Sequence, residues 1–151
     1  MVTQANRAER YRKAVLEQAL IREHFPFFHS RISGVELTCR GRILPTDQSE
    51  AYRVEIKYLP WCAPDVRIIE PKIDFTPGAH MYRSNNLCLY DWREQPWQKN
   101  WHLHETVIPW TAEWLLFYEL FLLTGKWHGK AADHPDIKTT NPAAATDHSQ
   151  N

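Results

Sequence analysis

The chain has 151 residues, of which 43% are hydrophobic and 24% charged, as expected for one globular domain. Lysine plus arginine and aspartate plus glutamate each total 18, so the formal net charge is zero. This balance excludes the strongly basic composition expected of a nonspecific nucleic-acid binder, and we expect no direct nucleic-acid partner.

The first predicted element is an amphipathic helix that ends before Pro26, because proline disfavours helical geometry in the residue preceding it. Asn6 followed by Glu9 fits a helix N-cap with an acid three residues later. Apolar residues recur at spacings of three and four and predict the buried face: Ala8, Tyr11, Val15 and Ala19, widened by Leu16 and Leu20.

Three segments, 35–40, 52–58 and 66–68, then alternate between apolar and polar residues. A period of two predicts half-buried strands. Their short connections, rich in proline, aspartate and serine, favour an antiparallel meander, and the first helix is expected to cover one of its faces. The stretch from Pro71 to Pro109 has no regular pattern, and irregular runs of this length are usually functional.

A second helix is predicted from about Pro109, which suits a first helical turn, to Gly125, a plausible C-cap. It is apolar on nearly all sides, so it should be central or lie at an interface. The stretch from Ile108 to Leu123 is shorter than the ~20 residues of a membrane span, and no span is expected. Residues 1–138 are predicted to form one domain, followed by a disordered tail over 139–151.

The three cysteines lie in different contexts. Cys39 is in phase with the apolar residues of a predicted strand and should be buried in the core. Cys62 lies in a proline-bounded turn. Cys88 lies in the irregular segment, close in sequence to His80 and two arginines, and cationic neighbours favour a reactive thiolate. The odd number of cysteines and the polar stretch from Met1 to Arg12 lead us to expect a cytoplasmic, reducing setting.

The histidines offer an alternative interpretation as a metal-dependent hydrolase. His102 and His104 would share a face of an extended segment, and His134 could join them only through the fold. A zinc site needs three or four ligands, and no Cys-x-x-Cys spacing is present, so we expect no metal. The sequence also lacks a phosphate-cradling glycine loop, and no cofactor is expected.

The order of these elements resembles the ubiquitin-conjugating enzyme family. The residues that carry the resemblance are Tyr58-x-Pro60, Pro64 and Pro71, then His80 and, eight residues later, Leu87-Cys88-Leu89. The resemblance extends over residues 6–123. It implies an α+β fold of that family, with an N-terminal helix packed on a four-stranded antiparallel meander, an active-site loop and a central apolar helix.

The resemblance also implies site residues. Cys88 takes the place of the family's thioester-forming cysteine, and His80 that of the histidine in its His-Pro-Asn motif. Tyr82 stands where the family has the asparagine that assists the oxyanion, so Tyr82, Asn85 and Asn86 are the candidate oxyanion donors. The residues expected at the partner-binding surface are Pro60, Trp61, Pro64, Trp97 and Trp101.

The tryptophan-rich ending from Trp110 to Gly129 is similar to a bacterial branch, the stand-alone conjugating-enzyme-like protein of CBASS antiphage operons. That similarity implies a thioester between Cys88 and the C-terminus of a partner protein, a CD-NTase-type nucleotidyltransferase. The chain has no nucleotide-binding loop of its own, so a separate activating enzyme or an already activated donor is implied. The missing asparagine keeps a second interpretation open, a non-catalytic protein-binding module. Homodimer formation is also left open.

Overall fold

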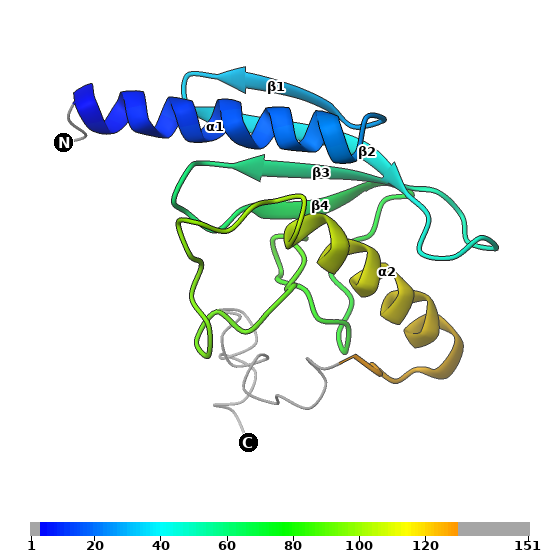
Figure 1. Cartoon of the computed structure of the whole chain (residues 1–151). Helices are drawn as coiled ribbons and strands as arrows, with labels where there is room; N and C mark the ends of the chain where they lie inside the picture. The colour runs from blue at the N-terminus through cyan, green and yellow to red at the C-terminus, as the bar shows by residue number, and fades with distance from the viewer. Residues whose placement is uncertain (1–3, 130–151) are drawn as a thin grey trace.

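The computed structural model describes residues 4–129 and forms an α+β fold with one sheet (Figure 1). The elements in chain order are α1 (Gln4–His24), β1 (His29–Ser33), β2 (Glu36–Ile43), β3 (Tyr52–Tyr58), β4 (Asp65–Glu70) and α2 (Val107–Thr124). Each strand pairs antiparallel with the next, in the spatial order β1-β2-β3-β4. The predicted architecture is therefore confirmed. The tail predicted over 139–151 lies outside the described residues.

β1 is the strand that the alternation pattern does not reveal. Its sequence, His-Ser-Arg-Ile-Ser, has a single large apolar residue, and only the family resemblance implied a fourth strand. β1 is specified instead by its register with β2, in which Ser30 lies opposite Cys39 and Ile32 opposite Leu37. This pairing places Ile32 against the core, with Ser30 on the same side, and leaves His29, Arg31 and Ser33 on the other side.

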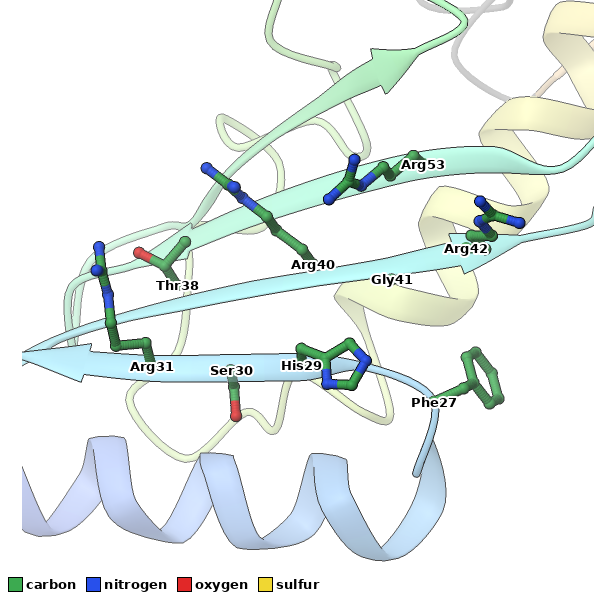
Figure 2. Close-up of a pocket in the computed structure, with 9 residues that line it drawn as sticks. All are labelled: Phe27, His29, Ser30, Arg31, Thr38, Arg40, Gly41, Arg42 and Arg53. Carbon is green, nitrogen blue, oxygen red and sulfur yellow. The ribbon is translucent and has the colours of Figure 1, made fainter.

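The outer face of the sheet is polar and rich in arginine (Figure 2). In that view Ser30 points toward α1, whereas the four labelled arginines point to the other side of the sheet. One carboxylate lies among the basic groups. Glu55 is only 1% exposed and pairs with Arg40 at 2.8 Å and with Arg67 at 3.0 Å. Burial by itself raises the pKa of Glu55, but the hydrogen bond from Arg40 and the charges of both arginines outweigh it and lower the pKa.

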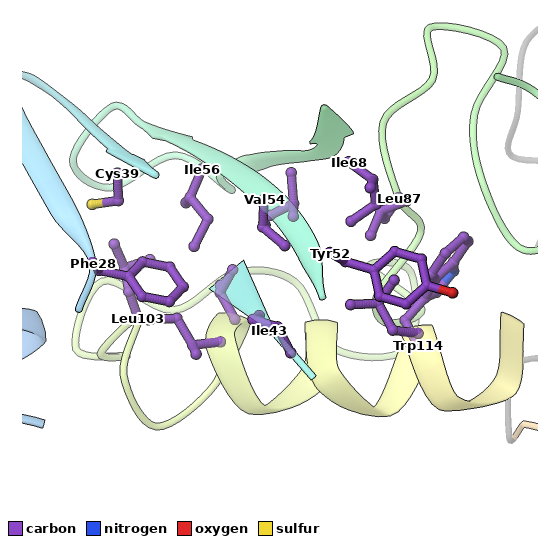
Figure 3. Packing of buried hydrophobic residues seen from close by; sticks show 14 of the residues in the cluster. Phe28, Cys39, Ile43, Tyr52, Val54, Ile56, Ile68, Leu87, Leu103 and Trp114 are labelled. Atoms are coloured by element: carbon purple, nitrogen blue, oxygen red, sulfur yellow. The ribbon is translucent and has the colours of Figure 1, made fainter. Parts of the chain in front are cut away.

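The inner face of the sheet builds the core (Figure 3). Side chains from β2, β3 and β4 meet residues of α2 and of the segment before it, including Cys39, Val54, Ile56, Leu103 and Trp114. Phe28 packs so closely on Gly41 that a Cβ at this position would overlap its ring. Glycine is therefore required in the middle of β2 to admit Phe28 into the core.

The face of α1 that packs on the sheet is not the predicted one. Tyr11 and Val15 are 50% and 40% exposed, while Ala14, Glu17 and Ile21 are buried. Glu17 explains the error, because a carboxylate occupies the centre of the buried face, where an apolar pattern cannot find it. The expected N-cap is also wrong, because the helix already includes Gln4.

Glu17 ties α1 to the segment before α2. Its carboxylate accepts hydrogen bonds from the backbone N–H of Leu103 at 2.8 Å and pairs with His102 Nδ1 at 2.9 Å. Lys13 lies 3.9 Å from the same carboxylate. A buried charge needs such partners to offset its lost hydration, so these contacts fix the position of residues 102–103 against the helix.

α2 begins at Val107, with Pro109 in its first turn, and ends at Thr124. The next residue, Gly125, has a φ of 73° and donates to the Phe121 carbonyl, as predicted for the C-cap. Its first half is buried, whereas Leu122 and Leu123 at its end are 61% and 83% exposed. By length and composition alone, this helix could also cross a membrane, a test that the core helix of a soluble protein passes as well.

Candidate active site around Cys88

Cys88 lies on the second arm of a hairpin formed by residues 80–88, within the irregular segment between β4 and α2. Met81 and Leu87 form an antiparallel bridge, and the Cys88 N–H donates to the carbonyl of His80 at 3.1 Å. The Leu87 N–H donates to the carbonyl of Val66 at 2.7 Å and joins the hairpin to β4. One backbone bond therefore ties the hairpin to the edge strand β4, and a second ties Cys88 to the opposite arm of the hairpin.

α2 fixes the other arm of this hairpin. The indole Nε1 of Trp114 donates to the carbonyl of His80 at 2.6 Å, so this carbonyl accepts from two donors, one on Cys88 and one on α2. Trp114 is 3% exposed and stacks on Tyr118 with ring centroids 5.3 Å apart. His80 itself is 4% exposed, with its ring 5.3 Å from that of Trp127. His80 contacts Cys88 through its backbone carbonyl.

The Cys88 residue is only 4% exposed, and burial raises the pKa of its thiol. The hydroxyl of Tyr82 opposes this shift by donating a hydrogen bond to the sulfur, while the charge of Asp91 adds to it. The Sγ atom also lies 3.7 Å from the carbonyl oxygen of Tyr90. The thiol is therefore predominantly protonated at neutral pH, with one donor in place to stabilise its thiolate form.

Tyr82 is half-buried, and the pKa of its hydroxyl is raised by burial, by the nearby Cys88 and by the hydrogen bond that it donates to this cysteine. A phenol with a raised pKa stays protonated under physiological conditions. The Tyr82 hydroxyl is therefore available as a hydrogen-bond donor to the sulfur. Tyr82 occupies the sequence position at which the resembling family has its asparagine.

A pocket of about 260 Å³ adjoins the hairpin, and Cys88 itself is not among its lining residues. Leu87 and Leu89, which flank Cys88 in sequence, contribute to its walls, as do Tyr82 and Tyr90. The remaining lining comes from the β3–β4 connection, Trp92 and the start of α2, and comprises Ala63, Pro64, Asp65, Trp92 and Val107. The pocket is mostly apolar, and the two neighbours of Cys88 in sequence form part of its wall, while Cys88 itself is 4% exposed.

The two candidate asparagines differ in their surroundings. The Oδ1 atom of Asn85 accepts from the Phe75 N–H at 2.7 Å, and its Nδ2 donates to Asp74 at 3.2 Å. With a φ of 70°, Asn85 also takes the left-handed conformation at the hairpin turn. Asn85 therefore holds the turn to residues 74–75, and its amide would have to leave both bonds to serve an oxyanion. Asn86 contributes its backbone carbonyl, which accepts from the Tyr82 N–H at 2.8 Å.

The expected partner-binding residues are divided among three places. Trp61, at the turn after β3, has a positive φ of 74°, and two cations lie over its ring: Arg10 at 4.9 Å and Lys99 at 4.5 Å from the centroid. Pro60 next to it is buried. Pro64 lines the pocket that adjoins the hairpin.

Trp97 and Trp101 belong to an aromatic cluster that also contains Tyr58, Tyr90 and Trp110. Trp97 and Trp101 meet edge to face, with centroids 5.1 Å apart. Tyr90 contacts three members of the cluster, with centroids between 5.4 and 6.3 Å away. Since Tyr90 also lines the pocket that adjoins the hairpin, this cluster supports one wall of that pocket, and both tryptophans are at most half-buried.

Sequence reasoning missed two residues beside the thiol, Tyr90 and Asp91. The side chain of Asp91 is only 9% exposed, and its Oδ1 accepts from the Arg93 N–H at 3.0 Å. The sequence gives one indication of Asp91, since it is a single carboxylate, three residues after Cys88, within an otherwise aromatic and apolar stretch. Its influence on the thiol is electrostatic, however, and a sequence does not show which charges approach each other.

The metal-dependent alternative finds no support in the described part of the chain. Within residues 4–129, no group of three histidine, cysteine, aspartate or glutamate side chains is arranged to hold a metal ion. His102 is engaged with Glu17, and His104 stacks on His24 at 4.3 Å. His134, the third residue of that alternative, lies outside the described residues.

The chain was also compared with known proteins. A family model described as "Type II CBASS E2 protein" matches residues 17–135, which is well over half of the chain. None of the curated proteins matches it. The matched range includes the whole sheet, the hairpin that carries Cys88 and α2.

Proposed function

The chain belongs to the family of Type II CBASS E2 proteins, conjugating-enzyme-like proteins of antiphage defence, and from this premise we propose that Cys88 carries an acyl group as a thioester. The observation that carries the proposal is the geometry of the hairpin, which bonds Cys88 to the His80 carbonyl and places Tyr82, Leu87 and Leu89 in the wall of a pocket within the matched range. The Tyr82 hydroxyl lowers the pKa of the Cys88 thiol. His80, Tyr82 and Cys88 share one hairpin whose two arms are bonded to each other and to α2.

The proposed reaction has two steps. The Cys88 thiolate attacks the activated C-terminal carbonyl of a partner protein, the carbon–sulfur bond forms, and the activating group leaves. The thiol proton passes to solvent. An amine then attacks the thioester, the carbon–nitrogen bond forms, the carbon–sulfur bond breaks, and the thiolate is regenerated.

Tyr82 acts in both steps of this proposal. Its hydroxyl stabilises the thiolate before attack and is the closest candidate to donate to the oxyanion of the tetrahedral intermediate. The raised pKa of Tyr82 favours this role, because the phenol retains its proton where a more acidic group would lose it. Asp91 opposes thiolate formation, so binding of a partner near Asp91 that reduces its influence would activate the nucleophile.

The acyl donor in this proposal is the C-terminus of a CD-NTase-type nucleotidyltransferase, activated by a separate enzyme. A narrow, mostly apolar pocket suits an extended chain end of small residues rather than a folded domain. Because Cys88 is only 4% exposed, the side chains around its sulfur rearrange locally in this proposal as the chain end enters.

The three cysteines provide the test. The chain is co-expressed with the nucleotidyltransferase of its operon and the activating enzyme, and adducts are separated without reductant. Wild type, Cys39→Ala and Cys62→Ala should each form an adduct that a thiol reductant removes, and Cys88→Ala should form none. An adduct that persists in Cys88→Ala would refute the assignment. Cys62→Ala is the matched control for an exposed thiol.

A non-catalytic binding module is the second candidate function, favoured by the low exposure and raised pKa of Cys88. On this interpretation the Trp61 turn and the aromatic cluster bind a partner without any acyl transfer. Phage protection separates the two functions. Cys88→Ala should lose protection if the thioester matters, and should protect as well as wild type if the chain is only a binding module.

A further inference from the structure

The outer face of the sheet contains a hollow of about 730 Å³ over β1, β2 and β3 (Figure 2). Four arginines and one histidine line it, namely Arg31, Arg40, Arg42, Arg53 and His29. No carboxylate is among its lining residues. A chain with zero formal charge therefore concentrates positive charge in one concave place, and such a place attracts anions.

The arrangement of these arginines is not explained by the needs of the fold. Arg42 and Arg53 lie directly opposite each other in the β2–β3 register, and like charges in that position destabilise a sheet. Arg40 is compensated by Glu55 at 2.8 Å, but within residues 4–129 neither Arg31 nor Arg42 has a carboxylate in ion-pair distance. Arg53 reaches only the exposed Glu70, at 4.0 Å. An anion bound between these arginines would reduce the repulsion of this pairing.

An aromatic ring stands at the edge of the same hollow. Phe27 is 56% exposed, and its ring is held by Phe25 and Phe28, with centroids 6.1 and 5.5 Å away. Of the exposed large apolar side chains in the described part of the chain, Phe27 is the one that lines the hollow. Protein interfaces usually gather several apolar or aromatic anchors, whereas a nucleotide needs one aromatic face for its base and cations for its phosphates.

We propose that this hollow binds a nucleotide with two or more phosphates, its base against Phe27 and its phosphates on Arg31, Arg42 and Arg53. The volume lies within the range of small-ligand sites, roughly 300–1,000 Å³. Guanidinium groups form paired hydrogen bonds to phosphate oxygens and suit this role better than lysines. The site is independent of the proposed thioester chemistry, since the Cys88 hairpin joins β4 and does not line the hollow.

Binding to the full chain is measured by calorimetry with ATP, inorganic triphosphate, adenosine and hexaglutamate. ATP should bind more tightly than triphosphate by about tenfold or more, the contribution expected from base stacking on an aromatic ring. Phe27→Ala should remove this difference and leave triphosphate binding unchanged. Cys88→Ala should bind ATP like wild type. Tighter binding of hexaglutamate than of ATP would overturn the proposal and indicate an acidic protein partner instead.

The arginines are tested with a charge-matched control. Arg42→Gln should weaken both ATP and triphosphate by about tenfold, whereas Arg12→Gln, which removes an exposed charge from α1, should change neither. The melting temperature of Arg42→Gln should be no lower than that of wild type, because the substitution removes a like-charge pair from the sheet. Equal affinities in the two variants, or a lower melting temperature for Arg42→Gln, would contradict the proposal.

Discussion

Two buried cysteines, Cys39 in the core and Cys88 in the hairpin, show how differently one protein can treat the same side chain. Cys39 has no exposed surface, and burial together with the charge of Glu17 raises its pKa to about 12. Cys88 is nearly as buried, but a hydroxyl donates to its sulfur and a pocket adjoins its hairpin. Burial therefore does not distinguish these two thiols, whereas the neighbouring hydroxyl and pocket do. The proposed function assigns the reactive role to Cys88 on the basis of this difference.

The largest expected effect comes from removing that donor. Tyr82→Phe should slow adduct formation at Cys88 by about 10²–10³-fold, the usual loss when one oxyanion donor is removed. The rate is followed by gel under non-reducing conditions. Tyr11→Phe removes an exposed hydroxyl from α1 and should react like wild type. If Tyr82→Phe and Tyr11→Phe formed the adduct at equal rates, the Tyr82 hydroxyl would not be what makes Cys88 differ from Cys39.

A substitution in the core should lower the stability of the fold without changing the rate of adduct formation at Cys88. Gly41→Ala places a Cβ against the ring of Phe28, and we expect the free energy of unfolding to fall by about 1–3 kcal/mol, as for other overpacked cores. Urea denaturation measures this loss. Under conditions in which the variant is folded, its rate of adduct formation should match wild type. A slowed rate would mean that core and hairpin are coupled.

The core thiol should also make stability depend on pH. The pKa of Cys39 is raised from 9.0 to about 12, so its contribution to stability is fully present below the unfolded pKa and is lost as pH rises toward the folded pKa. The free energy of unfolding should therefore fall with pH between pH 9 and 12 in wild type. Its slope there should be steeper than that of Cys39→Ala by up to about 1.4 kcal/mol per pH unit. Parallel curves for the two proteins would contradict the assigned environment of Cys39.

The smallest expected effect concerns the hairpin turn. Asn85→Ala removes the acceptor of the Phe75 N–H and puts alanine at a φ of 70°, which should cost about 1 kcal/mol in unfolding free energy. Asn85→Gly loses the same acceptor without the backbone strain and should cost less. Asn86→Ala is the matched control for a neighbouring amide. If Asn86→Ala, and not Asn85→Ala, abolished the adduct, Asn86 would replace Tyr82 as the oxyanion donor.

The sequence predicts much of this fold because its strands are patterned. The segments read from alternation became β2, β3 and β4, and Pro109 and Gly125 correctly marked the ends of α2. The buried face of α1 was missed because Glu17, a charged residue, holds its centre through contacts with residues 102–103 that are distant in sequence. Apolar periodicity has no means of finding a buried carboxylate.

The candidate site was only partly predictable. The spacing of His80 and Cys88 predicted an active-site loop through a family resemblance, and in the structure the two residues lie on opposite arms of a hairpin, joined by a backbone bond. The bond between the Tyr82 hydroxyl and the thiol and the charge of Asp91 depend on where side chains point. The arginine cluster of the outer face could not be predicted from the net charge, which is zero. The arginines are distant in sequence, and only the register of the strands brings them together.

The most direct test of the account replaces the proposed acyl-bearing sulfur with oxygen. Wild type and Cys88→Ser are each incubated with the partner nucleotidyltransferase and its activating enzyme, and intact masses are measured with and without a thiol reductant. Wild type should show a mass equal to both proteins minus one water, which the reductant removes. Cys88→Ser should accumulate the corresponding oxygen ester, which resists the reductant. A wild-type adduct that survives the reductant, or that maps to any other residue, would contradict the assignment of Cys88.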